Sequence, residues 1–281
     1  MLSYRHAFHA GNHADVLKHS IEVAILNYLI EKDKPFCYVD SHAGPGGYEL
    51  TRSFALKNKE FQTGISCLWQ QTNLPKLLQD YVNCVALFNN ADALTYYPGS
   101  PAIALQIMAH TLEKNRLQLF EQHRQEFSEL KEWAHQSRAV QAYQQDGFAG
   151  LISVLPPKEK RALVVIDPPY EVKTDYSTLI DTLKVTLKAF STGTYLIWHP
   201  LLSTGYKRSF VTQLSSLTNN WVYAQYCISH PSETGMYGSG VLVINPPWTL
   251  YKQLEQALPV MVKLLSQQAG AGYHLSRSQE S

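Results

Sequence analysis

The sequence predicts a Rossmann-like α/β fold, with a seven-stranded, mostly parallel sheet and helices between the strands. Short apolar runs rich in β-branched residues alternate with longer stretches of helical periodicity, as at residues 36–40, 117–120 and 162–166. A glycine-rich segment follows the first of these runs. The last two runs, at 221–228 and 241–244, are joined by a loop without helical periodicity. They are therefore expected to form an antiparallel pair.

A chain of 281 residues, of which 45% are hydrophobic and 17% are charged, can bury one large core or two small ones. We expect a single domain over residues 1–281. The formal net charge of +1 excludes a global electrostatic attraction for nucleic acid, so RNA binding would need local basic groups and shape. The four cysteines form no C-x-x-C pair, which is typical of reduced thiols in the cytoplasm. No apolar run has membrane-spanning length and no signal peptide is evident, so a soluble cytoplasmic protein is expected.

The N-terminal residues 1–13 mix aromatic, basic and imidazole groups without periodicity. Asn12 is predicted to cap a helix that runs to about residue 30, with Lys18 and His19 in its first turns. No cysteine or carboxylate completes a recognisable ligand set with the nearby histidines, so a metal site is not expected. A segment lying over a ligand pocket is the favoured interpretation.

The predicted strand at 36–40 is followed by His42, Ala43 and Gly44, and glycine allows a backbone to approach a ligand closely. A dinucleotide-binding loop is the rival interpretation. It would require a further glycine where this chain has Glu49, and an acidic residue after a prompt second strand. Instead, residues from about 52 to 93 form a predicted helical insertion, which is either an RNA-facing subdomain or a lid.

Two acidic residues follow the next predicted strands. Glu121 ends the strand at 117–120, where a carboxylate can accept hydrogen bonds from both hydroxyls of a ribose. The alternative is a solvated acid at a helix start. Asp146 follows the strand near 139–143, and it is a candidate acceptor for an adenine amino group or an N-cap for the helix at 148–155.

The stretch Asp167-Pro168-Pro169-Tyr170 follows the apolar strand at 162–166. The two prolines cannot continue the strand, so the backbone is expected to leave the sheet as an extended elbow at its carboxyl edge, where open α/β sheets bind ligands. The Asp167 carboxylate and the Pro168 carbonyl can accept both protons of a planar NH2 group while its ring stacks on Tyr170. The stretch resembles the signature of S-adenosylmethionine-dependent methyltransferases that act on adenine N6, cytosine N4 or glutamine amide nitrogen. The alternative is a proline turn.

The remaining elements complete the predicted sheet. A polar loop at 171–176 contains Lys173 beside the elbow, and strands at 195–198, 221–228 and 241–244 alternate with helices at 179–189, 207–217 and 250–265. Asn245-Pro246-Pro247-Trp248 is a second copy of the loose pattern. We interpret it as a structural exit into the last helix, with a substrate-side role as the less favoured alternative. The tail from about 270 to 281 is expected to be mobile. This strand arrangement is typical of a class I methyltransferase.

Several longer blocks carry a more specific resemblance. The opening from Met1 to His19 is one of them, and the others are Asp40 to Gly44, Tyr96 to Pro101, Asp146 to Phe148, and Asp167 to Tyr176 with Asn245 to Trp248. With these blocks, which span nearly the whole chain, the sequence resembles the RlmJ family of 23S ribosomal RNA adenine-N6 methyltransferases.

The resemblance implies a monomeric enzyme that transfers a methyl group from S-adenosyl-L-methionine to the N6 amino group of one adenine in 23S rRNA. The adenine would leave its stack, and Asp167, Pro168 and Tyr170 would act on its amino group and ring. The resemblance and the strand-end positions together give the candidate cofactor contacts Lys18, His19, His42, Gly44, Ser100, Glu121, Asp146, Gly147 and Asp167. The candidate RNA contacts are Tyr4, Arg5, His6, His9 and Lys173.

Three other functions remain open from the residues alone. A glutamine-amide methyltransferase would use the same elbow on a protein substrate. A DNA adenine methyltransferase would also use it, although the chain shows no evident target-recognition domain. A non-catalytic protein that binds the ribosome or RNA would bind no cofactor and transfer no methyl group.

Overall fold

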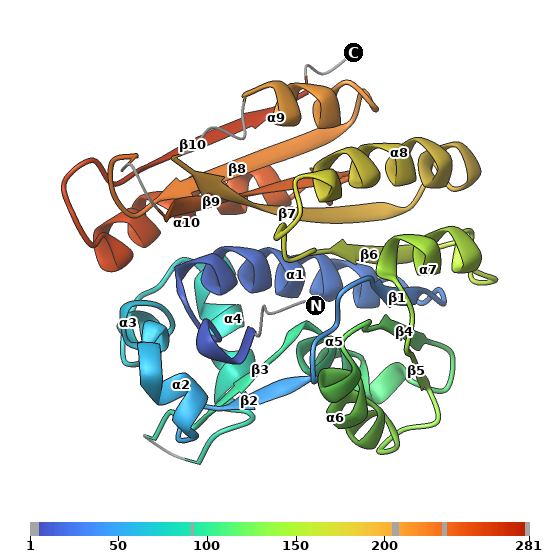
Figure 1. Cartoon of the computed structure of the whole chain (residues 1–281), viewed down its shortest axis with the longest axis horizontal. Coiled ribbons are helices and arrows are strands. Elements are labelled where there is room, and N and C mark those ends of the chain that lie inside the picture. Colours follow the sequence, from blue (N-terminus) through green and yellow to red (C-terminus); the bar gives the residue numbers. More distant parts are fainter. Residues whose placement is uncertain (1–5, 91–92, 204–207, 232–234, 279–281) are drawn as a thin grey trace.

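The computed structural model describes residues 6–90, 93–203, 208–231 and 235–278 (Figure 1). Its main sheet has eight strands in the order β10-β8-β9-β7-β6-β1-β4-β5, and β2 and β3 form a separate two-stranded sheet. The strands are β1 Cys37–Asp40, β2 Gly47–Glu49, β3 Tyr96–Pro98, β4 Arg116–Phe120, β5 Val140–Tyr143, β6 Ala162–Ile166, β7 Thr194–Leu202, β8 Trp221–Cys227, β9 Met236–Ile244 and β10 Gly272–Arg277.

The helices fall between these strands as the hydrophobic periodicity predicts. The α-helices are α1 His13–Glu31, α2 Ser53–Asn58, α3 Ser66–Trp69, α4 Lys76–Ala86, α5 Ser100–Met108, α6 Arg124–Ala134, α7 Gly147–Val154, α8 Thr174–Ala189, α9 Arg208–Ser215 and α10 Leu250–Leu265. Short 3-10 helices are η1 His6–Phe8, η2 Glu60–Thr63 and η3 Ala109–Thr111. None of the helices in the described part of the chain is long and apolar enough to cross a membrane.

The central strands are buried on both faces because helices cover both sides of the sheet. In β6, Leu163 and Val165 pack into the core on the side of α1, α4, α5 and α10. Val164 and Ile166 pack into the other core, with α7, α8 and α9. This alternation explains why all five residues of β6 are apolar, as is usual for a parallel strand between two helical layers.

The class I methyltransferase fold is confirmed, but the sheet has one strand more than predicted. Strand β10 lies in the tail that was expected to be mobile, and it pairs antiparallel with β8. As an edge strand it buries only part of one face, so its sequence, Gly-Tyr-His-Leu-Ser-Arg, has little of the apolar pattern that identifies inner strands. The expectation of a mobile tail was wrong for residues 272–277 because pairing, not side-chain burial, holds this segment.

Strand β7 is also longer than predicted, since it continues through His199 and Pro200 to Leu202. It pairs antiparallel with β9 over this extension, with Pro200 opposite Ser239. Strand β9 begins at Met236, five residues earlier than the predicted start at Val241. The β7–β9 pair therefore projects beyond the carboxyl edge of the parallel strands.

The segment expected to form a helical insertion contains α2, η2, α3 and α4. Helix α4 packs against α1 and α10, and its Leu77, Leu78 and Tyr81 are buried in the core they share. This segment therefore shares the main hydrophobic core. The two predicted roles, an RNA-facing subdomain or a lid, stay predictions.

Strand direction separates the two proline motifs. Strand β6 runs parallel to β7, whereas β9 runs antiparallel to it, with Ile244 beside Tyr195 at the start of β7. Asn245 therefore lies at the opposite edge of the sheet from Asp167. Its backbone has φ 50°, and its Nδ2 donates to the carbonyls of Ser191 and Gly193, at 2.8 Å each. These contacts support the interpretation as a structural exit.

We expect Asn245→Ala to lower the free energy of unfolding by about 2–3 kcal/mol, because it removes two hydrogen bonds and places alanine at positive φ. Asn245→Gly is the matched control, since glycine loses the same hydrogen bonds but tolerates the backbone conformation. Urea unfolding should rank the wild type above Asn245→Gly and Asn245→Gly above Asn245→Ala. Equal stability of the two variants would contradict the role of the backbone angle.

His199 lies buried in β7, stacked on Tyr223 of β8 with a centroid distance of 5.8 Å. Burial lowers the pKa of His199 to about 4, although a contact with the Pro200 carbonyl acts in the other direction. A histidine with a depressed pKa stabilises the fold in its neutral form. That stability is present above the unfolded pKa of about 6.5 and is lost as the pH falls towards the folded value.

Between about pH 7.5 and about pH 5, we therefore expect the wild type to lose about 2 kcal/mol more stability than His199→Gln, which has no titrating ring. Urea unfolding of both proteins at the two pH values measures the difference. Equal losses in the two proteins would show that His199 does not titrate below its ordinary range.

Candidate active site

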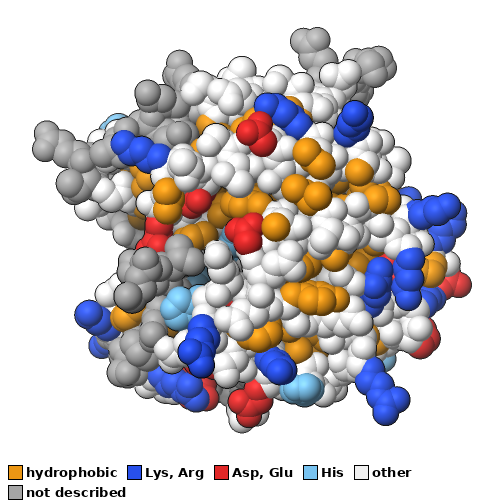
Figure 2. Space-filling view, turned by 45° about the vertical axis from the view of Figure 1, so that its right-hand side comes forward, with side chains coloured by type: hydrophobic (Ala, Val, Ile, Leu, Met, Phe, Trp, Pro, Cys, Tyr) orange, Lys and Arg blue, Asp and Glu red, His pale blue; other side chains and the backbone are white. Residues whose placement is uncertain are grey.

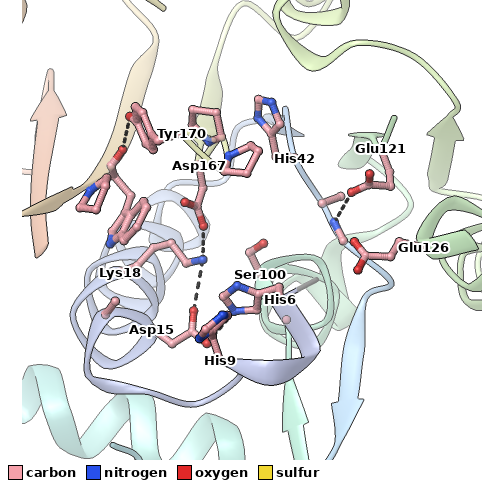
Figure 3. Close-up of a pocket in the computed structure, with 18 of the residues that line it drawn as sticks. His6, His9, Asp15, Lys18, His42, Ser100, Glu121, Glu126, Asp167 and Tyr170 are labelled. Carbon is pink, nitrogen blue, oxygen red and sulfur yellow. Dashed lines mark hydrogen bonds and ion pairs between the residues drawn. The ribbon is translucent and has the colours of Figure 1, made fainter. Parts of the chain in front are cut away.

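A cavity of about 410 Å³ lies at the carboxyl ends of β1, β4, β6 and β7. It receives residues from η1 and α1 as well as from the loops after these strands (Figure 3). Most of the predicted site residues line it: His6, His9, Lys18, His19, His42, Gly44, Ser100, Glu121, Asp146, Asp167, Pro168 and Tyr170. Segments far apart in the sequence thus meet where the strand ends predict.

Among the described residues, two predicted ones, Gly147 and Lys173, do not line the cavity. Gly147 begins α7, where a Cβ would lie 1.9 Å from the Ser41 carbonyl oxygen, so its observed role is close packing. Lys173 is exposed at the start of α8. Tyr4 and Arg5 lie outside the described residues.

The elbow after β6 is held by Tyr170. This residue has φ 51°, an unusual angle for a bulky side chain, and its hydroxyl donates to the Trp198 carbonyl at 2.6 Å. Its ring lies 4.4 Å from that of Tyr176 and is 8% exposed. Tyr170 therefore turns the chain at the end of the elbow, and it anchors the elbow while contributing to the cavity wall. Strain of this kind is concentrated at functional sites.

A buried ion-pair network joins the elbow to α1. The Lys18 ammonium contacts the Asp167 carboxylate and lies 3.3 Å from Asp15 Oδ1 (Figure 3). Asp15 also accepts from the Gly11 backbone N–H at 2.8 Å and contacts His6 Nε2 at 2.9 Å. The network fixes the position of Asp167 relative to the N-terminal segment.

The charges in this network set the ionisation of its members. Burial alone would lower the pKa of Lys18, but Asp167 and Asp15 raise it above the ordinary value. Burial would raise the pKa of Asp15, but His6, Lys18 and His19 hold it well below its ordinary value. Lys18 is therefore a cation and Asp15 an anion at neutral pH.

The opposite side of the cavity carries Glu121, whose carboxylate accepts from the backbone N–H groups of Gly44 at 3.0 Å and His123 at 2.7 Å. Burial raises the pKa of Glu121, and these hydrogen bonds oppose the rise. Two N–H donors leave further lone pairs on the carboxylate for a ligand. Because the Gly44 N–H donates to Glu121, it is not free for a phosphate, which argues against the rival interpretation as a dinucleotide-binding loop.

His42 and Asp146 complete this side. The His42 ring packs edge-on against Phe148 with a centroid distance of 5.3 Å, and burial lowers the pKa of His42 to about 4, so the ring is neutral. Asp146 accepts from the Ala149 N–H at 2.8 Å, which confirms its interpretation as an N-cap. It lines the cavity at the same time, so the two predicted roles are compatible.

Sequence reasoning missed an apolar wall formed by the β7–β9 extension and three additional acids. The wall consists of Trp198, Pro200, Leu202 and Met236. It was missed because the predicted β7 ended too early. The additional acids all lie in the first turn of a helix: Asp15 in α1, Glu126 in α6 and Asp175 in α8. Only their position near a helix start was available as a signal.

Carboxylates dominate the described lining of the cavity: Asp15, Glu121, Glu126, Asp146, Asp167 and Asp175. Lys18 is the single lysine or arginine among the same described residues, and the five histidines add charge only when protonated. Such a cavity favours a cationic ligand and disfavours a pyrophosphate. In the part of the chain that the structure describes, no group of histidine, cysteine and carboxylate residues is arranged to hold a metal ion.

Comparisons with known proteins agree with this geometry. Residues 33–276 match the family model described as "Ribosomal RNA large subunit methyltransferase D, RlmJ". Two proteins named "Ribosomal RNA large subunit methyltransferase J" are similar to the chain. The one from Escherichia coli (strain K12) is 40% identical over 272 residues, covering 92% of each chain. The one from Haemophilus influenzae (strain ATCC 51907 / DSM 11121 / KW20 / Rd) is 40% identical over 268 residues, covering 94% of each.

A solved structure extends the similarity to the whole fold. The crystal structure of protein LPL1258 from Legionella pneumophila str. Philadelphia 1 has a TM-score of 0.88 and 32% sequence identity. The match covers 97% of this chain and 99% of that one. The chain therefore belongs to the RlmJ family of ribosomal RNA large subunit methyltransferases.

Proposed function

We propose that the protein transfers the methyl group of S-adenosyl-L-methionine to the N6 amino group of one adenine in 23S rRNA. The observation that carries the proposal is the elbow at Asp167, Pro168 and Tyr170, which opens on an acidic cavity in a member of this family. We further infer that it acts as a monomer in the cytoplasm.

The residues of the cavity fit the proposed cofactor. Adenosylmethionine carries a sulfonium and an ammonium group, and the six lining carboxylates favour positive charge. Glu121 would accept from the ribose hydroxyls, Asp146 would face the adenine amino group, and Lys18, His19, His42, Gly44, Ser100 and Asp167 would surround the rest. Gly147 would act through its close packing on Ser41. The bound cofactor would supply an electrophilic methyl group.

The elbow would hold the adenine for in-line attack. Asp167 and the Pro168 carbonyl would accept the two N6 protons, which directs the nitrogen lone pair away from the ring. Lys18 supports this role because its ion pair holds the Asp167 carboxylate in position at the elbow. Catalysis would come mainly from positioning, and the N6 proton would leave as the new bond makes the nitrogen acidic.

The RNA would contact the protein around the mouth of the cavity. His6 and His9 line it, and Tyr4 and Arg5 directly precede them in the sequence. Lys173 is exposed on the next element after the elbow. These residues are the proposed contacts to the target base and its phosphates.

The first test is transfer of labelled methyl from S-adenosylmethionine to protein-free 23S rRNA that lacks its own modifications, followed by nucleoside analysis. We expect label in N6-methyladenosine, and we expect Asp167→Ala to lower the rate by at least about 100-fold through loss of an amino-group acceptor. Circular dichroism checks that the variant folds. Label on a protein would favour the glutamine-amide alternative, and near-normal turnover by Asp167→Ala would contradict the assignment.

Tyr4→Ala separates RNA recognition from cofactor binding. We expect it to abolish most RNA methylation while the dissociation constant for S-adenosylmethionine stays within about twofold, because Tyr4 is assigned to the base. Calorimetric titration measures the affinity, and Tyr273→Ala, at an exposed position on β10, is the matched control. A parallel loss of cofactor affinity in Tyr4→Ala would place Tyr4 on the cofactor side instead.

A further inference from the structure

A buried pair of acidic residues lies behind the cavity, and the proposed mechanism uses neither of them. Glu22 of α1 and Asp40 at the end of β1 are both 0% exposed. The Tyr38 hydroxyl lies between them, 2.9 Å from Glu22 Oε1 and 3.0 Å from Asp40 Oδ2. Two carboxyl groups thus share one phenol in the protein interior.

Counting the hydrogen-bond donors and acceptors shows that this set of three side chains needs an additional proton. A phenol has one proton and can donate it to one carboxylate only. Towards the other carboxyl group it must accept, so that group has to carry a proton of its own. If both acids were ionised, one of the two short contacts would join oxygen lone pairs without a proton between them.

The surroundings of the two acids decide which of them is protonated. Asp40 accepts from the Ser100 hydroxyl at 2.6 Å and from the His42 N–H at 3.1 Å. Glu22 Oε2 has no hydrogen-bond partner among the described residues. A buried ionised oxygen without a partner is costly, so the proton belongs on Glu22. The chain then runs from Glu22 to Tyr38 and from Tyr38 to Asp40.

The electrostatics agree with this assignment. Burial raises the pKa of Glu22 well above its ordinary value, and the charge of Asp40 adds to the rise. Burial also raises the pKa of Asp40, but the hydrogen bonds from Ser100 and His42 and the charge of Lys18 oppose it. Asp15 acts on Glu22 in the same direction as Asp40, while Lys18 opposes the rise.

The direction of the hydrogen bonds from Glu22 through Tyr38 to Asp40 affects the cavity through Ser100. The Ser100 hydroxyl donates its hydrogen bond to Asp40, and Ser100 also lines the cavity. On the cavity side its oxygen can then only accept. Together with the Asp40 charge behind it, this makes a local site for a cationic donor. Of the groups in adenosylmethionine, the α-ammonium is the strongest such donor.

We propose that Glu22 is a protonated carboxylic acid in the folded protein at neutral pH and acts as a positioning residue. Through Tyr38 it fixes Asp40 as the buried anion and Ser100 as an acceptor facing the ammonium group of the cofactor. The protonation of Glu22 stands independently of the activity, whereas the effect on the ammonium group rests on the proposed function.

Infrared difference spectroscopy of the full-length protein tests the protonation directly. The wild type minus Glu22→Gln should show the carbonyl stretch of a carboxylic acid that persists at neutral pH. Glu159→Gln is the matched control, because the Glu159 side chain is only 4% exposed but is bound by the Arg116 guanidinium through contacts of 2.8 and 3.2 Å. It should lose a carboxylate band. A carboxylate band in the Glu22→Gln difference would overturn the proposal.

Cofactor affinity tests the positioning role. Glutamine at position 22 is neutral and can still donate to Tyr38, so Glu22→Gln should bind S-adenosylmethionine within about twofold of the wild type. Tyr38→Phe interrupts the hydrogen-bond chain from Glu22 to Asp40. We expect its dissociation constant for S-adenosylmethionine to rise about tenfold, as for one lost hydrogen bond. Equal weakening in both variants, or none in Tyr38→Phe, would overturn the role. If the wild type transferred no methyl group at all, the infrared result would still decide the protonation.

Discussion

The buried ammonium of Lys18 is the constraint on which the site depends. Taking a charge out of water is expensive unless its partners are close, and here the partners come from α1 and from the elbow after β6. Asp15 and Asp167 must therefore stay within reach of Lys18. Asp15 in turn holds Gly11 and His6, so the N-terminal segment is fixed over the cavity by the same charge. Loss of Lys18 would leave both carboxylates without the ammonium group that they share.

Strand direction gives the two proline motifs different roles although their sequences are alike. The carboxyl edge of the parallel strands gathers Asp40, Glu121 and Asp167 from β1, β4 and β6. The antiparallel β9 delivers Asn245 to the other edge, where its side chain closes the α8–β7 connection. The same motif thus lines the cavity at one edge and holds a loop at the other. A motif indicates a function only together with the direction of the strand before it.

The sequence predicts what local physics determines. The inner strands, the α1 cap at Asn12, the α7 cap at Asp146 and the gathering of acids at strand ends follow from burial on both faces and from capping chemistry. What it does not predict depends on distant partners. Strand β10 is held by pairing with β8, and the positive φ of Tyr170 is held by Trp198. Glu22 looks like any exposed acid on a helix until the fold places Tyr38 against it.

The charge distribution explains how such a cavity can serve a polyanionic substrate. On the face of the molecule that Figure 2 shows, hydrophobic side chains lie across the middle, and Lys and Arg side chains lie mostly towards the edges. Inside the cavity, carboxylates outnumber Lys18, so a phosphate entering it would be repelled. A nucleobase, which carries no charge, would not be repelled. This charge pattern supports the proposal that a base turned out of its stack enters the cavity while the charged backbone stays outside. The proposed phosphate contacts include His9, whose pKa is raised by its hydrogen bond to Glu60.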